Sequence, residues 1–156
     1  MHDTRIRDAT LADAGVIVAA NAALARESEG RALDLPTLGA GVRRQLTDPV
    51  CGRYFLAERD GQVVGQMLIT YEWSDWRNGR WWWIQSVYVA PHARRTGVYR
   101  ALHEYVRRLA RESGEACGMR VFVDRDNPRA HATYTAMGMR DSHYDTLEDD
   151  WVAPRA

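Results

Sequence analysis

The chain contains no lysine, because all 21 of its basic residues are arginine. This absence excludes mechanisms that need a Schiff-base lysine or the phosphate-binding lysine of a P-loop. The 21 acidic residues balance the arginines, so the formal net charge is zero and no overall field attracts nucleic acid or anionic lipid. We therefore expect neither a nucleic acid nor a membrane as a partner.

Cysteine is scarce, and long apolar runs are missing. The two cysteines, Cys51 and Cys117, match no CxxC or mixed Cys/His spacing, and no metal site is predicted. Two thiols in a chain of this composition are typical of reduced cysteines, which predicts a cytoplasmic location. No run of about 18 apolar residues could span a bilayer, and residues 1–8 are charged, unlike a signal peptide.

The remaining composition is that of a globular protein. The chain has 156 residues, of which 46% are hydrophobic and 27% charged. This length suits one domain with a sizeable core, so we predict a single domain over residues 1–156. No serine lies in a G-x-S-x-G context, which removes the support for a hydrolase triad.

Periodicity and turn residues predict an alternation of strands and helices. Thr10 with Asp13 forms a capping-box pattern, and Asp60-Gly61 is a hairpin turn. The predicted strands cover residues 4–7, 54–57, 63–71, 81–89, 119–123 and 143–147. The predicted helices begin at residues 10, 35, 97 and 127 and end near 30, 46, 113 and 138. This order favours an α/β (mixed α+β) fold, a mixed sheet with helices on its faces.

The segment from Val87 to Leu102 carries the first functional signal. A strand ends there, a loop supplies Arg94, Arg95 and Gly97, and a helix begins. The unpaired N–H groups and the positive end of the helix dipole would meet in one place, where a diphosphate could bind. The alternative interpretation is an ordinary strand-to-helix turn with solvated arginines.

Two motifs together resemble the GNAT superfamily of acetyl-CoA-dependent N-acetyltransferases. The stretch Arg94-Arg95-Thr96-Gly97-Val98-Tyr99 matches the signature (Q/R)-x-x-G-x-(G/A), except that Tyr99 stands where Gly or Ala is usual. A second stretch, residues 127–139, resembles the family segment N-x-x-A-x-x-x-Y-x-x-x-G-(F/M/A). The resemblance extends from about Thr4 to Leu147 and implies a three-layer fold with a central, mixed, mostly antiparallel sheet flanked by helices.

The resemblance also implies a reaction and its residues. It implies an N-acetyltransferase that moves the acetyl group of acetyl-CoA, its cosubstrate, directly to a primary amine of a small molecule. Tyr134 matches the family's tyrosine general acid. The implied cofactor-binding residues are Val87, Tyr88, Val89, Arg94, Arg95, Thr96, Gly97, Val98, Tyr99, Asn127 and Ala130. The Tyr99 ring must turn away from the cofactor, or else it shapes the acyl pocket and changes the acyl donor.

The general base is the least defined role. The aromatic stretch before the fourth strand is similar to that of the polyamine-acetylating branch, where a glutamate is expected near Gln85. An amide cannot act as a base, so deprotonation falls to a water held by Gln85 and Ser86 or to Glu72 on the preceding strand. The neighbouring tryptophans either bind an alkylammonium or pack the sheet and a dimer surface.

Three functions therefore stay open on the sequence. The first is acetylation of a small-molecule amine by a homodimeric enzyme, with the dimer expected from exposed aromatic residues and edge strands. The second is a binding or regulatory module of the same fold without turnover, motivated by Tyr99 and the missing base. The third is acetylation of a protein N-terminus or lysine.

Overall fold

The computed structural model describes residues 3–152. The chain divides into two compact units, residues 1–122 and residues 123–156, and each unit is described here by itself. The assignment of a single domain stays a prediction. No helix among residues 3–152 is long and apolar enough to cross a membrane.

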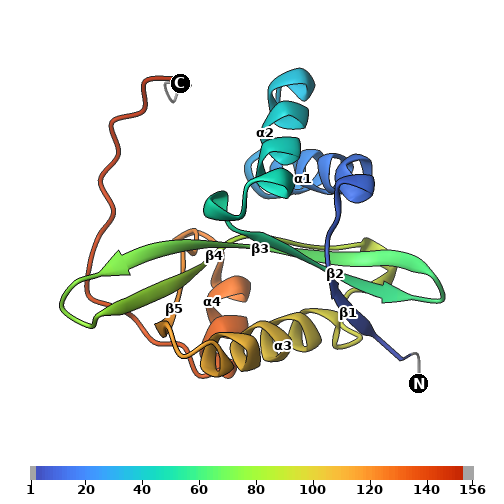
Figure 1. The fold of residues 1–156 in the computed structure, drawn as a ribbon. Coiled ribbons are helices and arrows are strands. Elements are labelled where there is room, and N and C mark those ends of the chain that lie inside the picture. The colour runs from blue at the N-terminus through green and yellow to red at the C-terminus, as the bar shows by residue number, and fades with distance from the viewer. Residues whose placement is uncertain (1–2, 153–156) are drawn as a thin grey trace. The chain divides into compact units, whose positions relative to one another are not determined.

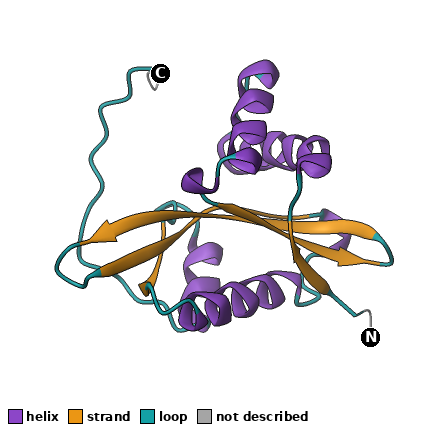
Figure 2. Ribbon diagram, in the orientation of Figure 1, coloured by secondary structure: helices purple, strands orange, loops and turns teal. Residues whose placement is uncertain are grey.

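The first unit is built on one five-stranded sheet with the strand order β1-β2-β3-β4-β5 (Figures 1 and 2). Neighbouring strands are antiparallel except β4 and β5, which are parallel. This confirms the predicted mixed, mostly antiparallel sheet. The strands are β1 (Arg5–Asp8), β2 (Arg53–Arg59), β3 (Gln62–Ser74), β4 (Gly79–Val89) and β5 (Ala116–Val121).

Helices cover both faces of this sheet, as Figure 1 shows. On one face lie α1 (Ala14–Glu29) and α2 (Leu35–Thr47), and on the other lies α3 (Val98–Glu112). Alternate residues of β2 serve the two layers, because successive strand side chains point to opposite faces. Tyr54 and Leu56 pack with Ala14, Ile17 and Val42 of the first layer, whereas the Phe55 ring meets Tyr105 of α3.

Local sequence signals explain most element boundaries. Asp60 and Gly61 have φ angles of 49° and 75°, the left-handed pair that a two-residue hairpin turn requires. Thr10 and Asp13 form the predicted capping box, although the first turn, Leu11–Asp13, is 3-10 and α1 begins at Ala14. Gly65 lets α3 approach β3, since an added Cβ would lie 2.8 Å from Val98 Cγ1. That contact fixes the start of α3 against the sheet.

The second unit contains one helix, α4 (Pro128–Ala136), and a long tail. The Asn127 side chain caps α4 by accepting a hydrogen bond from the Ala130 N–H at 3.0 Å, as the Asn-Pro start predicts. The predicted strand at His143–Leu147 is wrong: the described tail residues form neither helix nor strand. Alternation alone cannot make a strand, which needs a paired neighbour, and the Tyr144 and Leu147 side chains are largely exposed.

A half-buried ion pair links β1 to the start of α1, and it predicts an acid-sensitive stability. Arg7 donates two 2.9 Å hydrogen bonds to Asp13 and one of 2.7 Å to Glu58. The hydrogen bonds from Arg7 lower the pKa of Asp13 from 3.8 to about 2, against the opposing effect of burial. Because the folded pKa is the lower one, this stabilisation is complete above about pH 4 and is lost as the pH falls toward 2.

We expect Asp13→Asn to lower the free energy of unfolding at neutral pH by about 1–2 kcal/mol and to flatten its decline between pH 4 and pH 2. Urea denaturation at a series of pH values measures both effects. Asp48→Asn is the matched control, because an asparagine side chain still accepts the Val50 N–H at the start of the 3-10 turn Pro49–Cys51. An equal pH dependence in the wild type and Asp13→Asn would contradict the assignment.

Candidate functional site

The loop of residues 94–97 joins β4 to α3 and has the backbone of an anion site. Arg95 and Gly97 have φ angles of 63° and 88°, and Gly97 caps α3. At the N-terminus of α3, the Ala101 N–H donates a hydrogen bond to the Gly97 carbonyl at 3.0 Å. The N–H groups of the preceding turn of α3 therefore point out of the helix end, where the dipole is positive.

The space in front of this loop is open. An added Cβ on Gly97 would meet no other heavy atom within 4 Å, so a phosphate can approach the backbone closely at this position. Arg95 is exposed beside it. The Val98 side chain is 1% exposed and belongs to the core, which leaves only its N–H for a ligand.

Arg59 at the end of β2 holds the loop in place. Its guanidinium donates to Thr96 Oγ1 at 2.6 Å and to the Thr96 carbonyl at 2.9 Å. Thr96 Oγ1 in turn donates to the Ala93 carbonyl at 2.7 Å. The hydrogen bonds of the Thr96 side chain thus stabilise the conformation of the loop. No local pattern in the sequence indicates this role for Arg59, which lies 37 residues before Thr96.

The C-terminal part of β4, which contains the predicted residues Val87, Tyr88 and Val89, has no partner in β5. The β5 register stops at Ile84 opposite Val121, whereas β4 continues to Val89 along β3. The Ala90 N–H bonds the Val64 carbonyl at 2.9 Å, and so points toward β3. Since backbone groups alternate along a strand, the N–H groups of Val87 and Val89 point to the opposite edge. A β-bulge at Gln85 precedes this segment.

Arg94 lies against this edge and links it to α1. Its Nε donates to the Val89 carbonyl at 2.8 Å, and its Nη2 donates to Glu27 Oε2 at 2.5 Å. The Tyr88 hydroxyl donates to the other Glu27 oxygen at 3.2 Å. Burial, with the nearby Glu27 carboxylate, raises the pKa of Tyr88. Glu27 was not predicted, because nothing in a solvated helix end distinguishes it from Glu29.

Tyr99 turns away from the loop. Its hydroxyl lies 3.0 Å from Nδ1 of His103, one helical turn further along α3, and the two rings meet edge to face. His103 is 2% exposed, and burial lowers the pKa of its imidazole. The bulky residue in the signature therefore lies along α3, which agrees with the first of the two orientations expected for its ring.

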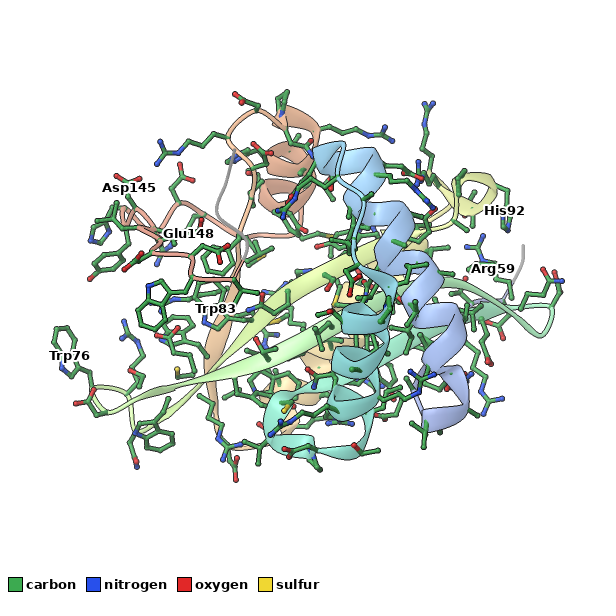
Figure 3. The ribbon with its side chains drawn as sticks, turned by 90° about the horizontal axis from the view of Figure 1, so that it is seen from above. Arg59, Trp76, Trp83, His92, Asp145 and Glu148 are labelled. Atoms are coloured by element: carbon green, nitrogen blue, oxygen red, sulfur yellow. The ribbon has the colours of Figure 1, made fainter. Side chains whose placement is uncertain are left out.

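Glu72 lies on β3 within a cluster of partners. Its carboxylate accepts the Trp83 indole N–H at 2.6 Å and two contacts from Arg120 Nη1 at 3.2 and 3.4 Å. Figure 3 shows Trp83 on the part of the sheet that α1 and α2 leave uncovered. Both oxygens of the Glu72 carboxylate are thus engaged by side chains of β4 and β5.

The remaining predicted residues belong to the second unit. Asn127 and Ala130 bond each other in the cap of α4, and Tyr134 lies half-buried on the same helix. The predicted residues thus fall into two groups, each assembled within its own unit. Among residues 3–152, no group of three or more His, Cys, Asp or Glu side chains is placed to hold a metal ion.

Comparison with a family model matches residues 23–139 to the acetyltransferase (GNAT) family. The matched range includes both predicted motifs and covers most of the chain. No curated protein matches the chain in a sequence comparison.

Solved structures agree with this match. A possible acetyltransferase from Clostridium difficile 630 is 38% identical, with a TM-score of 0.90 over 96% of this chain and 99% of that one. A probable acetyltransferase is 25% identical, with a TM-score of 0.79 over 97% and 98%. An aminoglycoside N-acetyltransferase in complex with CoA shares the fold at 14% identity, with a TM-score of 0.79 over 97% of each chain. The chain belongs to the GNAT acetyltransferase family.

Proposed function

We propose that the protein transfers the acetyl group of acetyl-CoA directly to the primary amine of a small molecule. One observation carries the proposal: an open, positively polarised loop follows immediately on a strand whose edge is unpaired by β5. The loop suits the diphosphate of a long ligand, and the unpaired strand edge suits the amides along the rest of that ligand.

The residues present fit such a ligand. The N–H groups of the 94–97 loop and of the first turn of α3 would hold the diphosphate, with Arg95 beside them. The N–H groups of Val87 and Val89 would hold the amide-bearing arm. Arg94 already bonds the Val89 carbonyl, so we infer that it is displaced from this edge when the arm binds. Its new partner would be a phosphate.

The chemistry needs three things from the protein. Bound acetyl-CoA supplies an activated acetyl group as its thioester. The neutral amine forms a C–N bond to the acetyl carbon while the C–S bond breaks. Free β4 N–H groups stabilise the developing oxyanion. The Tyr134 phenol donates its proton to the departing thiolate, and the amine gives its proton to a base.

For that base we favour water at Gln85 and Ser86, one of the two predicted candidates. Gln85 is the extra residue of the β4 bulge and its side chain is exposed to solvent. Glu72 stays a prediction, but its engagement by Arg120 and Trp83 argues against it.

Two alternatives differ in their expected behaviour. A binding module would hold CoA without turnover, and the orientation of Tyr99 along α3 removes one reason for that interpretation, since the ring does not fill the loop. A protein acetyltransferase would use a peptide acceptor. The homodimer and the cytoplasmic location also stay predictions.

The test is acceptor-dependent release of CoA from acetyl-CoA, followed with a thiol reagent across polyamines, amino acids, aminoglycosides, arylalkylamines and short peptides. We expect turnover with one class of small amine, at least tenfold above the rate without acceptor. CoA binding by calorimetry without turnover on any acceptor would support the binding module. Turnover on peptides alone would support the protein acetyltransferase.

A further inference from the structure

Two residues of β4 and the residue that follows β5 form an aromatic surface on the sheet face that carries α1 and α2. Register places it there, because Leu68, which packs with the α1 and α2 core, is followed on the same face by Thr70 and Glu72. Thr70 pairs with Trp83 and Glu72 with Trp81, and Trp83 pairs with Arg120 of β5. The rings of Trp81, Trp83 and Phe122 make up this surface.

Its rings are held rigidly. Trp83 and Phe122 stack with centroids 4.3 Å apart and planes 26° from parallel. The Trp83 indole N–H is fixed by Glu72, and Arg120 Cζ lies 4.0 Å from the centroid of the Trp81 ring. Phe122 nevertheless remains 54% exposed. A preformed aromatic face that stays open to solvent suits the stacking of another planar ring.

The charges around the aromatic surface disfavour a second cation. Glu72 is neutralised by Arg120, and Arg77 places another guanidinium 5.0 Å from the Trp81 centroid. Among the described residues of the first unit, the side chains seen to contact these rings carry one negative charge, on Glu72, and two positive charges, on Arg77 and Arg120. A polyamine, whose second ammonium would lie among them, meets net repulsion. An uncharged ring does not.

The surface is continuous with the edge where the reaction is proposed to occur. Trp83 and Val87 lie four residues apart on β4, about 13 Å along an ideal strand, with the Gln85 bulge between them. A ligand whose ring stacks on the aromatic surface can direct a primary amine along β4 toward the Val87 N–H.

We propose that this aromatic surface binds the acceptor, and that the acceptor is an aromatic primary monoamine, an arylalkylamine. The proposal rests on the proposed acetyl transfer and names its substrate class. It departs from the similarity to the polyamine-acetylating branch, because Arg120 cancels the carboxylate that a polyamine would need.

The test compares tyramine with spermidine in the wild type, Phe122→Ala, Phe122→Tyr and Trp76→Ala. Wild type should have a kcat/KM for tyramine at least about tenfold above that for spermidine. Phe122→Ala should raise the KM for tyramine about tenfold with kcat within about twofold, and Phe122→Tyr should restore it. Trp76 is the matched control: it is an exposed aromatic residue in the turn between β3 and β4, labelled in Figure 3 away from Trp83, and Trp76→Ala should change neither constant.

Calorimetric binding of tyramine separates failure of this proposal from failure of acetyl transfer. Tyramine that binds the wild type about tenfold more tightly than Phe122→Ala, without turnover, would support the aromatic site and contradict the proposed reaction. Turnover with spermidine preferred, equal effects of Phe122→Ala on both amines, or no tyramine binding would each overturn the aromatic site.

Discussion

Tyr134→Phe should lower kcat about 100-fold while leaving the KM for acetyl-CoA within about twofold. The substitution removes one hydroxyl from a half-buried ring on α4 and keeps the ring. An alkylthiol is mostly protonated at neutral pH, so the departing sulfur has to gain a proton, and a general acid positioned to supply it typically contributes about 10²–10⁴-fold. An effect confined to kcat distinguishes this role from a contact that merely binds the cosubstrate.

Steady-state release of CoA measures the effect, and Tyr144→Phe provides the control. Tyr144 is a tyrosine of the same unit with a largely exposed side chain, so its hydroxyl should be dispensable. Equal turnover of the wild type and Tyr134→Phe would remove Tyr134 from the mechanism. A rise in the KM for acetyl-CoA with unchanged kcat would assign it to binding instead.

The fold could be predicted from the sequence wherever the stabilising interactions lie within a few residues of one another. The Asp60-Gly61 turn needs two left-handed residues, and the Thr10 and Asn127 caps satisfy helix N–H groups from within a few residues. The segment 143–147, predicted as a strand, has alternating residues, but alternation alone supplies no stabilising interaction of this local kind. A strand there depends on a neighbouring strand, and no local pattern specifies that neighbour.

The candidate site likewise has a part that local sequence predicts and a part that depends on distant residues. The 94–97 loop follows from Gly97 and from the strand-to-helix order, so the sequence was enough to locate it. The contacts that hold it come from far away, through Arg59 to Thr96 and through Glu27 to Arg94, which are 37 and 67 residues apart. Surface arginines and glutamates occur throughout this chain, so only the folded structure shows which of them pair.

The tryptophans of β4 show what strand alternation determines and what it leaves open. Alternation along a strand excludes one common pocket for Trp81, Trp82 and Trp83, as expected. The structure buries Trp82 against Tyr71 on the α3 face and leaves Trp81 and Trp83 on the opposite face. The neutralisation of Glu72 by Arg120 was invisible in the sequence, because it depends on the parallel pairing of β4 with β5.

Gly97→Ala should weaken CoA binding about tenfold or more, which corresponds to about 1.4 kcal/mol of binding free energy. At φ 88° an L-residue is strained, and its Cβ would enter the open space from which a phosphate approaches the loop. Relaxing that strain would turn the N–H groups of the 94–97 loop away from their common direction, so both consequences weaken the anion site.

Gly61→Ala separates binding from backbone strain. Gly61 also has a left-handed φ, 75°, with nothing within 4 Å of an added Cβ, but it lies in the β2–β3 turn. Each substitution should lower the free energy of unfolding by about 1–2 kcal/mol in urea denaturation. Calorimetric titration with CoA, which needs no acceptor, should show weakened binding for Gly97→Ala alone. Because the two variants share the strain, equal CoA affinity in both would show that the 94–97 loop does not hold the diphosphate.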